Sequence, residues 1–315
     1  MTTFGYFLSS EEHSPKELLR QAKAAERAGF AALWISDHYH PWIDAQGQSS
    51  FVWSMLGALS EVVSLPVTTA VTCPLMRIHP AIIAQAAATA QILLDGRFRF
   101  GVGTGEALNE HILGDAWPPA QERQHMLEEA VEIIRELWSG RLVTYDGEYY
   151  DVETARLYSL PEQPPPIYIS GLGPRSVELA GRIGDGYIST KPDQELVDAF
   201  HKSGGAGKPA AGGLKVCWGT DEEEARNTAH RLWPTSGLHG EASQLLPLPR
   251  HFEQLAQLVT PESLTIPCGP DPEDHLRGIQ EYIDAGYDEI YIAQIGPEQD
   301  EFFEFYSTVV LPQLR

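Results

Sequence analysis

The stretch Ala31-Ala32-Leu33-Trp34-Ile35-Ser36-Asp37-His38-Tyr39-His40-Pro41-Trp42 joins a short apolar run to a cluster of ionisable and aromatic side chains. Its first five residues are typical of a buried parallel strand, and the polar residues follow at the strand's carboxyl end. The stretch 98–110, FRFGVGTGEALNE, repeats this arrangement. In parallel α/β proteins, binding and catalytic residues usually lie at the carboxyl ends of the strands. We therefore expect the two stretches to face each other across one site.

Eight apolar runs that read as strands mostly alternate with helical segments along the chain. The alternation predicts a parallel sheet with helical crossovers, and eight units favour a closed (β/α)8 TIM barrel over an open doubly wound sheet. We expect a single domain over residues 1–315, with a glycine-rich loop at 203–213 and an irregular insertion at about 233–270, near the barrel mouth. The expected strands are 3–8, 31–36, 67–72, 98–103, 167–170, 186–190, 214–218 and 289–293.

The amino-acid composition restricts the expected binding partners and the expected cellular compartment. The net charge of −22 argues against nucleic acid and anionic membrane surfaces, and leaves a small-molecule substrate as the expected partner. No apolar run approaches the roughly 20 residues that cross a bilayer, and no signal peptide is recognisable. The three cysteines are odd in number and far apart, which fits a reducing compartment, and we expect a cytoplasmic protein.

The first stretch offers a candidate acid or base. His38 follows a strand, and histidine has the side chain whose unperturbed pKa lies nearest neutrality, so it can act in proton transfer or simply make a structural hydrogen bond. Trp42 can form the wall of a ligand pocket. The His38–His40 pair lacks a third ligand at a recognisable spacing, and no metal site is predicted.

The second stretch combines glycines with a carboxylate. Gly101, Gly103 and Gly105 allow the backbone to approach a ligand, although their spacing is not that of the dinucleotide fingerprint. Glu106 is either a helix-cap carboxylate or a catalytic acid or base. Further along, the turn 171–175 is either an anion cradle, with Arg175 adding charge, or a plain tight turn.

Several motifs together resemble the luciferase-like flavin and deazaflavin oxidoreductases, and within them the coenzyme F420-dependent glucose-6-phosphate dehydrogenase group. The resemblance extends over essentially the whole chain and implies a TIM barrel with insertions, commonly a homodimer, that binds F420 in its mouth. An FMN-dependent monooxygenase of the same superfamily is the alternative, and a non-catalytic ligand-binding barrel is a third. The matching stretches are 36–42, 103–110, 171–174, 184–186 and 127–131.

The resemblance also implies roles for individual residues. His38 would take the alcohol proton while hydride passes to C5 of the deazaflavin, Glu106 would manage the proton at N1, and Trp42 would wall the substrate pocket. The roles of His38 and Glu106 could be exchanged. A bulge or a non-prolyl cis peptide is expected at Ala70–Val71, and Cys73 stands where a threonine is expected. The residues that match cofactor-binding positions are Asp37, Val71, Cys73, Thr104, Gly105, Asn109, Leu172, Gly173 and Arg175.

The resemblance indicates the cofactor more clearly than it indicates the substrate. In the sugar-phosphate enzymes a threonine and several cations hold a phosphate, and here Thr190 and Lys191 match two substrate-binding positions. The stretch Pro261–Ile266 contains no lysine or arginine, and Asp288 stands where a cation is expected. A phosphate dianion would lose charge-assisted partners, so another alcohol, sugar or reducible substrate is favoured over glucose 6-phosphate.

Overall fold

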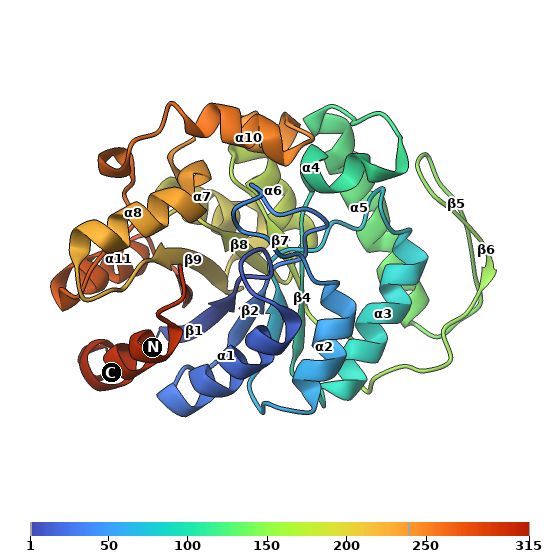
Figure 1. Cartoon of the computed structure of the whole chain (residues 1–315). Coiled ribbons are helices and arrows are strands. Elements are labelled where there is room, and N and C mark those ends of the chain that lie inside the picture. Colours follow the sequence, from blue (N-terminus) through green and yellow to red (C-terminus); the bar gives the residue numbers. More distant parts are fainter. Residues whose placement is uncertain (1, 239, 315) are drawn as a thin grey trace.

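The computed structural model describes residues 2–238 and 240–314 and contains a closed barrel of parallel strands in the order β1-β10-β9-β8-β7-β4-β3-β2. Helices surround the barrel (Figure 1). The predicted TIM barrel is therefore confirmed. The barrel strands are β1 Thr3–Leu8, β2 Leu33–Ile35, β3 Val67–Thr69, β4 Phe98–Val102, β7 Ile167–Ser170, β8 Gly186–Ser189, β9 Ala210–Val216 and β10 Glu289–Gln294.

The helices connect successive strands over the outside of the barrel, and β5 Val143–Asp146 and β6 Asp151–Ala155 form a separate antiparallel pair. Short 3-10 or π segments extend or connect several helices. The α-helices are α1 Pro15–Ala28, α2 Val52–Ser60, α3 Pro80–Leu93, α4 Ala107–Glu110, α5 Ala120–Trp138, α6 Pro174–Ile183, α7 Gln194–Phe200, α8 Glu222–Leu232, α9 Ala242–Leu245, α10 Pro249–Ala256, α11 Pro272–Asp284 and α12 Gln299–Phe305.

Helix α1 shows how local sequence sets an element's bounds. The Ser14 side chain accepts a hydrogen bond from the Glu17 backbone N–H, and Pro15 occupies the first helical position, where a missing N–H costs nothing. Gly29 ends the helix with a φ of 93°, a conformation that glycine adopts without strain. The strand β2 can then begin only four residues later, which brings the first polar stretch to the barrel mouth.

Aromatic rings pack against glycines of β9 on both faces of the barrel wall. Trp34 stacks on Tyr291 with ring centroids 4.2 Å apart. A Cβ on Gly213 would lie 2.9 Å from the Trp34 ring, and a Cβ on Gly212 would lie 2.4 Å from Tyr282. The expected loop at 203–213 is therefore wrong over its last four residues, which belong to β9. There, glycine makes room for large rings and does not signal flexibility.

The segment expected to be irregular, 233–270, contains short helices, including α9 and α10, so that expectation is wrong in part. Phe252 of α10 is fully buried and meets Trp42 edge to face, with ring centroids 5.3 Å apart. It also belongs to one cluster with Leu108 of α4, and Figure 1 shows α10 beside α4. The insertion thus packs on both polar stretches at the barrel mouth.

Candidate active site

His38 lies directly after β2 and is surrounded by hydrogen-bonding groups. Its Nε2 atom lies 3.5 Å from Glu11 Oε1, and the two side chains are 10% and 2% exposed. Its Nδ1 atom lies 3.2 Å from the His40 carbonyl oxygen and 3.2 Å from Asn109 Nδ2. Because Nδ1 is enclosed by its own loop, Nε2 is the nitrogen that can exchange a proton with a ligand.

Glu11 is held in place by two serines, Ser9 and Ser36, whose hydroxyl groups donate to its Oε2 atom over 3.1 and 2.7 Å. These bonds leave Oε1 free to face His38. A carboxylate in this position stabilises the imidazolium that forms when the ring takes up a proton. Glu11 belongs to neither of the two motif stretches, so the sequence analysis did not single it out. Its position after the predicted strand 3–8 is the signal that could have indicated it.

Asn109 connects the two polar stretches. Its Oδ1 accepts from the backbone N–H groups of Tyr39 and His40 at 2.9 and 3.2 Å, and its Nδ2 donates to Glu106 Oε2 at 3.4 Å. The residue is buried and lies within α4. The two stretches therefore face each other as expected, and Asn109 fixes their distance. Glu106 is half-buried at the start of α4, where its side chain makes no cap hydrogen bond.

Asp37 belongs to a second cluster beneath the mouth, with Arg77 and Glu110. Arg77 donates to Asp37 Oδ1 at 3.0 Å, and its backbone N–H donates to Glu110 Oε2 at 2.9 Å. Burial raises the pKa of Glu110 to about 7, although Arg77 opposes that rise. Asp37 Oδ2 is buried and has no hydrogen-bond partner among the described residues. A polar ligand atom is the partner that this oxygen lacks.

The remaining predicted cofactor positions lie around the same mouth. The Ala70–Val71 peptide bond is cis, as expected from the resemblance. A Cβ on Gly103 would lie 2.9 Å from Val71, and one on Gly105 would lie 2.6 Å from the buried sulfur of Cys73. Thr104 is half-buried beside them. Because these residues are small or closely packed, backbone atoms and not side chains face the ligand at this turn.

The turn before α6 is more open. A Cβ on Gly173 would meet nothing within 4 Å, and Leu172 and Arg175 are exposed. The Gly173 N–H donates to Ser176 Oγ at 3.3 Å, so this one backbone donor is already engaged. The orphaned Asp37 oxygen and the open, cationic α6 turn fit a cofactor with a polar ring system and an anionic tail.

Of the substrate positions, Thr190 and Lys191 lie directly after β8 and are exposed. Asp288 lies elsewhere, because it precedes β10 at the amino end of the strands, where its side chain accepts the Ala210 N–H at 2.9 Å. The expectation that position 288 belongs to a phosphate site is therefore wrong: this aspartate connects two strands at the opposite end of the barrel.

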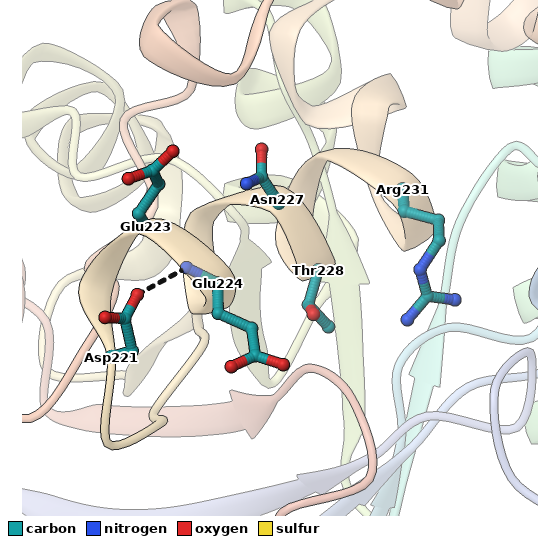
Figure 2. Close-up of a pocket in the computed structure, with 6 residues that line it drawn as sticks. All are labelled: Asp221, Glu223, Glu224, Asn227, Thr228 and Arg231. Carbon is teal, nitrogen blue, oxygen red and sulfur yellow. Dashed lines mark hydrogen bonds between the residues drawn. The ribbon is translucent and has the colours of Figure 1, made fainter.

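One hollow of about 370 Å³ lies along α8 and not at the mouth. Figure 2 shows its lining on successive turns of α8, where Asp221 accepts from the Glu224 N–H. Residues 2–238 and 240–314 contain no group of three or more His, Cys, Asp or Glu side chains that could hold a metal. None of the helices described is long and apolar enough to span a membrane. Cys73, Cys217 and Cys268 are free thiols.

Comparison with known proteins agrees with this geometry. The family model described as luciferase-like monooxygenase matches residues 2–289. The chain therefore belongs to the luciferase-like family.

Within that family the chain is 38% identical to an F420-dependent glucose-6-phosphate dehydrogenase of Microbacterium testaceum, over 99% of this chain and 97% of the relative. It is 37% identical to an F420-dependent hydroxymycolic acid dehydrogenase of Mycobacterium tuberculosis, over 99% and 88% of the two chains. Among solved structures, an F420-dependent secondary alcohol dehydrogenase in complex with an F420–acetone adduct superposes with a TM-score of 0.92. The two chains are 30% identical, and the match covers 100% of this chain and 99% of the other.

Proposed function

We propose that this protein is a coenzyme F420-dependent oxidoreductase that acts on the CH–OH group of an alcohol or sugar. The observation that carries the proposal is the arrangement of His38, Glu11, Asn109 and Glu106 at the barrel mouth, together with F420-dependent relatives that match nearly the whole chain. When bound, the deazaflavin accepts hydride at C5 from the alcohol carbon. The protein's own residues bind both molecules and move the protons.

His38 is the proposed base for the alcohol proton. In the tautomer that carries its proton on Nδ1, the His40 carbonyl accepts that proton and Nε2 is free to take up another. Proton uptake at Nε2 then places the new positive charge beside Glu11 Oε1. Removing the hydroxyl proton offsets the positive character that hydride departure builds on carbon.

Glu106 is the proposed proton donor toward N1, and Trp42 the wall of the substrate pocket. The Trp42 ring lies 5.1 Å from the His38 ring and is fixed from behind by Phe252. The orphaned Asp37 oxygen and the turn from Thr104 to Gly105 would hold the ring system of F420. The remaining proposed cofactor contacts are Val71, Cys73, Asn109, Leu172, Gly173 and Arg175, and the proposed substrate contacts are Thr190 and Lys191.

For the whole molecule, we propose a cytoplasmic homodimer built from single-domain chains. Three free, buried cysteines support a reducing compartment. Uncharged helices with exposed apolar side chains support an assembly of two chains.

The test is a fluorescence titration of the purified apoprotein with F420 and with FMN, followed by anaerobic mixing of the loaded protein with 2-propanol, cyclohexanol, glucose and glucose 6-phosphate. We expect F420 to bind, FMN to bind far more weakly, and at least one alcohol to bleach the F420 absorbance without oxygen. Preferential FMN binding with oxygen consumption would refute the proposal and place the chain among the flavin monooxygenases. F420 binding without turnover of any donor would support a ligand-binding barrel.

A further inference from the structure

The layer of the barrel lumen just below the mouth is lined by small side chains and one lysine. Trp34 of β2 reaches Gly213 on β9, across two intervening strands, so Gly213 faces the lumen. Because side chains alternate along a strand, Lys215 faces the lumen as well, one step nearer the mouth. By the same alternation, four other strands of the barrel contribute small residues to this layer: Ser36, Gly103, Ser170 and Ala293.

Lys215 has donors that the protein does not use. Its Nζ atom lies over the Trp233 ring, 4.3 Å from the centroid, and Trp233 is fixed because its indole N–H donates to Glu12 Oε1. In the part of the chain that the structure describes, the Lys215 ammonium makes no hydrogen bond and no ion pair. An ammonium group carries three donors, and at this half-buried position water or a ligand supplies the acceptors for them.

The surroundings of Lys215 indicate which acceptor it takes. Burial lowers the pKa of Lys215, while the nearby carboxylates of Glu11 and Glu12 act in the opposite direction. The positive charge is thus already balanced in part, and a phosphate dianion would be placed next to carboxylates. A neutral hydroxyl oxygen accepts from an ammonium without that repulsion. Thr190 lies beside the same strand, because its Cγ2 would be 3.5 Å from a Cβ on Gly213.

We propose that Lys215, with Thr190, binds a second hydroxyl group of the substrate, distant from the carbon that loses hydride, and so selects unphosphorylated polyols or sugars. The indole of Trp233 supplies the adjoining apolar face, as aromatic rings do in sites for molecules of mixed polarity. This inference rests on the proposed F420-dependent alcohol oxidation and names its substrate class.

The test compares cyclohexanol with trans-1,4-cyclohexanediol, which differ by one distant hydroxyl, in the wild type, in Lys215→Met and in Lys202→Met. Methionine keeps the packing on Trp233 but removes the donors, and Lys202 is an exposed lysine outside β9, in the segment that follows α7. We expect the diol-to-alcohol ratio of kcat/KM to fall about tenfold or more in Lys215→Met, through KM, since one charge-assisted hydrogen bond is lost. Lys202→Met should keep the wild-type ratio, and Lys215→Arg should retain part of it.

Three results would overturn the inference. The first is an equal loss of both activities in Lys215→Met and Lys215→Arg, which would mean that Lys215 acts on the catalytic groups or on folding. The second is an unchanged ratio. The third is a preference of the wild type for glucose 6-phosphate over glucose that Lys215→Met abolishes, which would make the lysine a phosphate ligand. An F420 titration on each variant separates these results from failure of the proposed function, in which F420 would not bind or no alcohol would reduce it.

Discussion

At the scale of single residues, Glu11 determines whether His38 can act as an efficient base. Glu11→Gln keeps the size of the side chain and removes its charge, so the imidazolium at His38 Nε2 loses its counter-ion. We expect kcat to fall roughly 10- to 100-fold, with KM and the F420 dissociation constant changed much less, because the effect lies in proton transfer. Steady-state kinetics at saturating F420 measure this, with the exposed Glu195→Gln as control. An unchanged kcat would remove Glu11 from the mechanism.

Gly105 is required by its backbone and by its neighbours. Its φ is 70°, and an added Cβ would lie 2.6 Å from Cys73 Sγ and 3.2 Å from Glu110 Cγ. Gly114 has a φ of 90° but nothing within 4 Å of its Cβ, so Gly114→Ala isolates the backbone cost. We expect Gly114→Ala to lose about 1 kcal/mol of unfolding free energy, and Gly105→Ala about 2–4 kcal/mol. Equal losses in urea denaturation would show that the close contacts relax without cost.

Glu12 makes stability depend on pH. Burial is the main cause that raises its pKa from 4.5 to about 7. The folded protein therefore holds a proton that the unfolded chain releases, so this contribution to stability is complete below about pH 4.5 and is lost as pH rises through 7. Glu12→Gln lacks the titration but can still accept from Trp233. Relative to the wild type, we expect it to gain roughly 2–3 kcal/mol between pH 5 and pH 8 in chemical denaturation.

The comparison with Glu12→Gln cancels other buried groups that titrate in both proteins. The contribution of Glu110 to the stability of the protein is also lost as pH rises over this range. The contribution of His13, whose pKa burial lowers to about 4, is instead gained as pH rises from 4 to 6.5. A difference between the two proteins that stays constant from pH 5 to pH 8 would contradict the assignment to Glu12.

At the scale of elements, Arg77 ties together the segments that follow three neighbouring strands. It lies after β3, its guanidinium binds Asp37 after β2, and its backbone N–H binds Glu110 of α4, which follows β4. Each of these segments carries proposed cofactor contacts. Breaking a buried ion pair by removing one partner costs about 3–5 kcal/mol, because the other charge is left uncompensated.

We therefore expect Arg77→Met to weaken F420 binding at least about tenfold and to lower stability by several kcal/mol, with Arg77→Lys in between. Fluorescence titration and urea denaturation give the two quantities. The control is Arg182→Met, which removes an exposed pair with Glu128 and should cost at most about 1 kcal/mol. If Arg77→Met behaves like Arg182→Met, the three segments are held by other contacts.

The sequence predicted the strands well where an apolar run has clear ends, as in β1 and β4, and the elements poorly where composition misleads. Residues 210–213 read as a glycine-rich loop, but they form a strand because rings from distant elements, Trp34 and Tyr282, fill the space above them. Helix α10 was missed because proline and leucine are frequent around it, while its one fully buried side chain, Phe252, is fixed by a contact with Trp42 far away in the chain.

The residues of the candidate site also fall into two groups, those that the sequence indicated and those that it did not. The residues in motifs, such as His38 and Glu106, were found because they follow strands in recognisable stretches. Glu11, Arg77 and Lys215 were not, because each contacts a partner 18 to 40 positions away in the chain: His38 for Glu11, Asp37 for Arg77 and Trp233 for Lys215. Local sequence does not show which charged side chains the barrel closure brings inside. Only the alternation of β9 could have indicated that Lys215 faces the lumen.

At the scale of the whole molecule, α2 and α3 pack against each other, and neither contains a charged residue. Apolar side chains exposed together on an uncharged surface often mark a protein–protein interface. In the single chain, Ile82 and Leu93 are 57% and 45% exposed, and the helical repeat places both on one face of α3. Phe51, just before α2, is 53% exposed. We expect a second copy of this chain to cover that face.

Light scattering at micromolar concentration should therefore give twice the mass of one chain. The double variant Ile82→Glu/Leu93→Glu should give the mass of a single chain. Dimerisation would bury two carboxylates per chain, and the free energy needed to remove them from water exceeds the free energy that a typical interface gains. Leu258→Glu places a charge at an 80% exposed leucine elsewhere and should remain a dimer. A monomeric wild type would refute the homodimer. A double variant that stays dimeric would instead move the interface away from α3, because the charged side chains would then still lie in water.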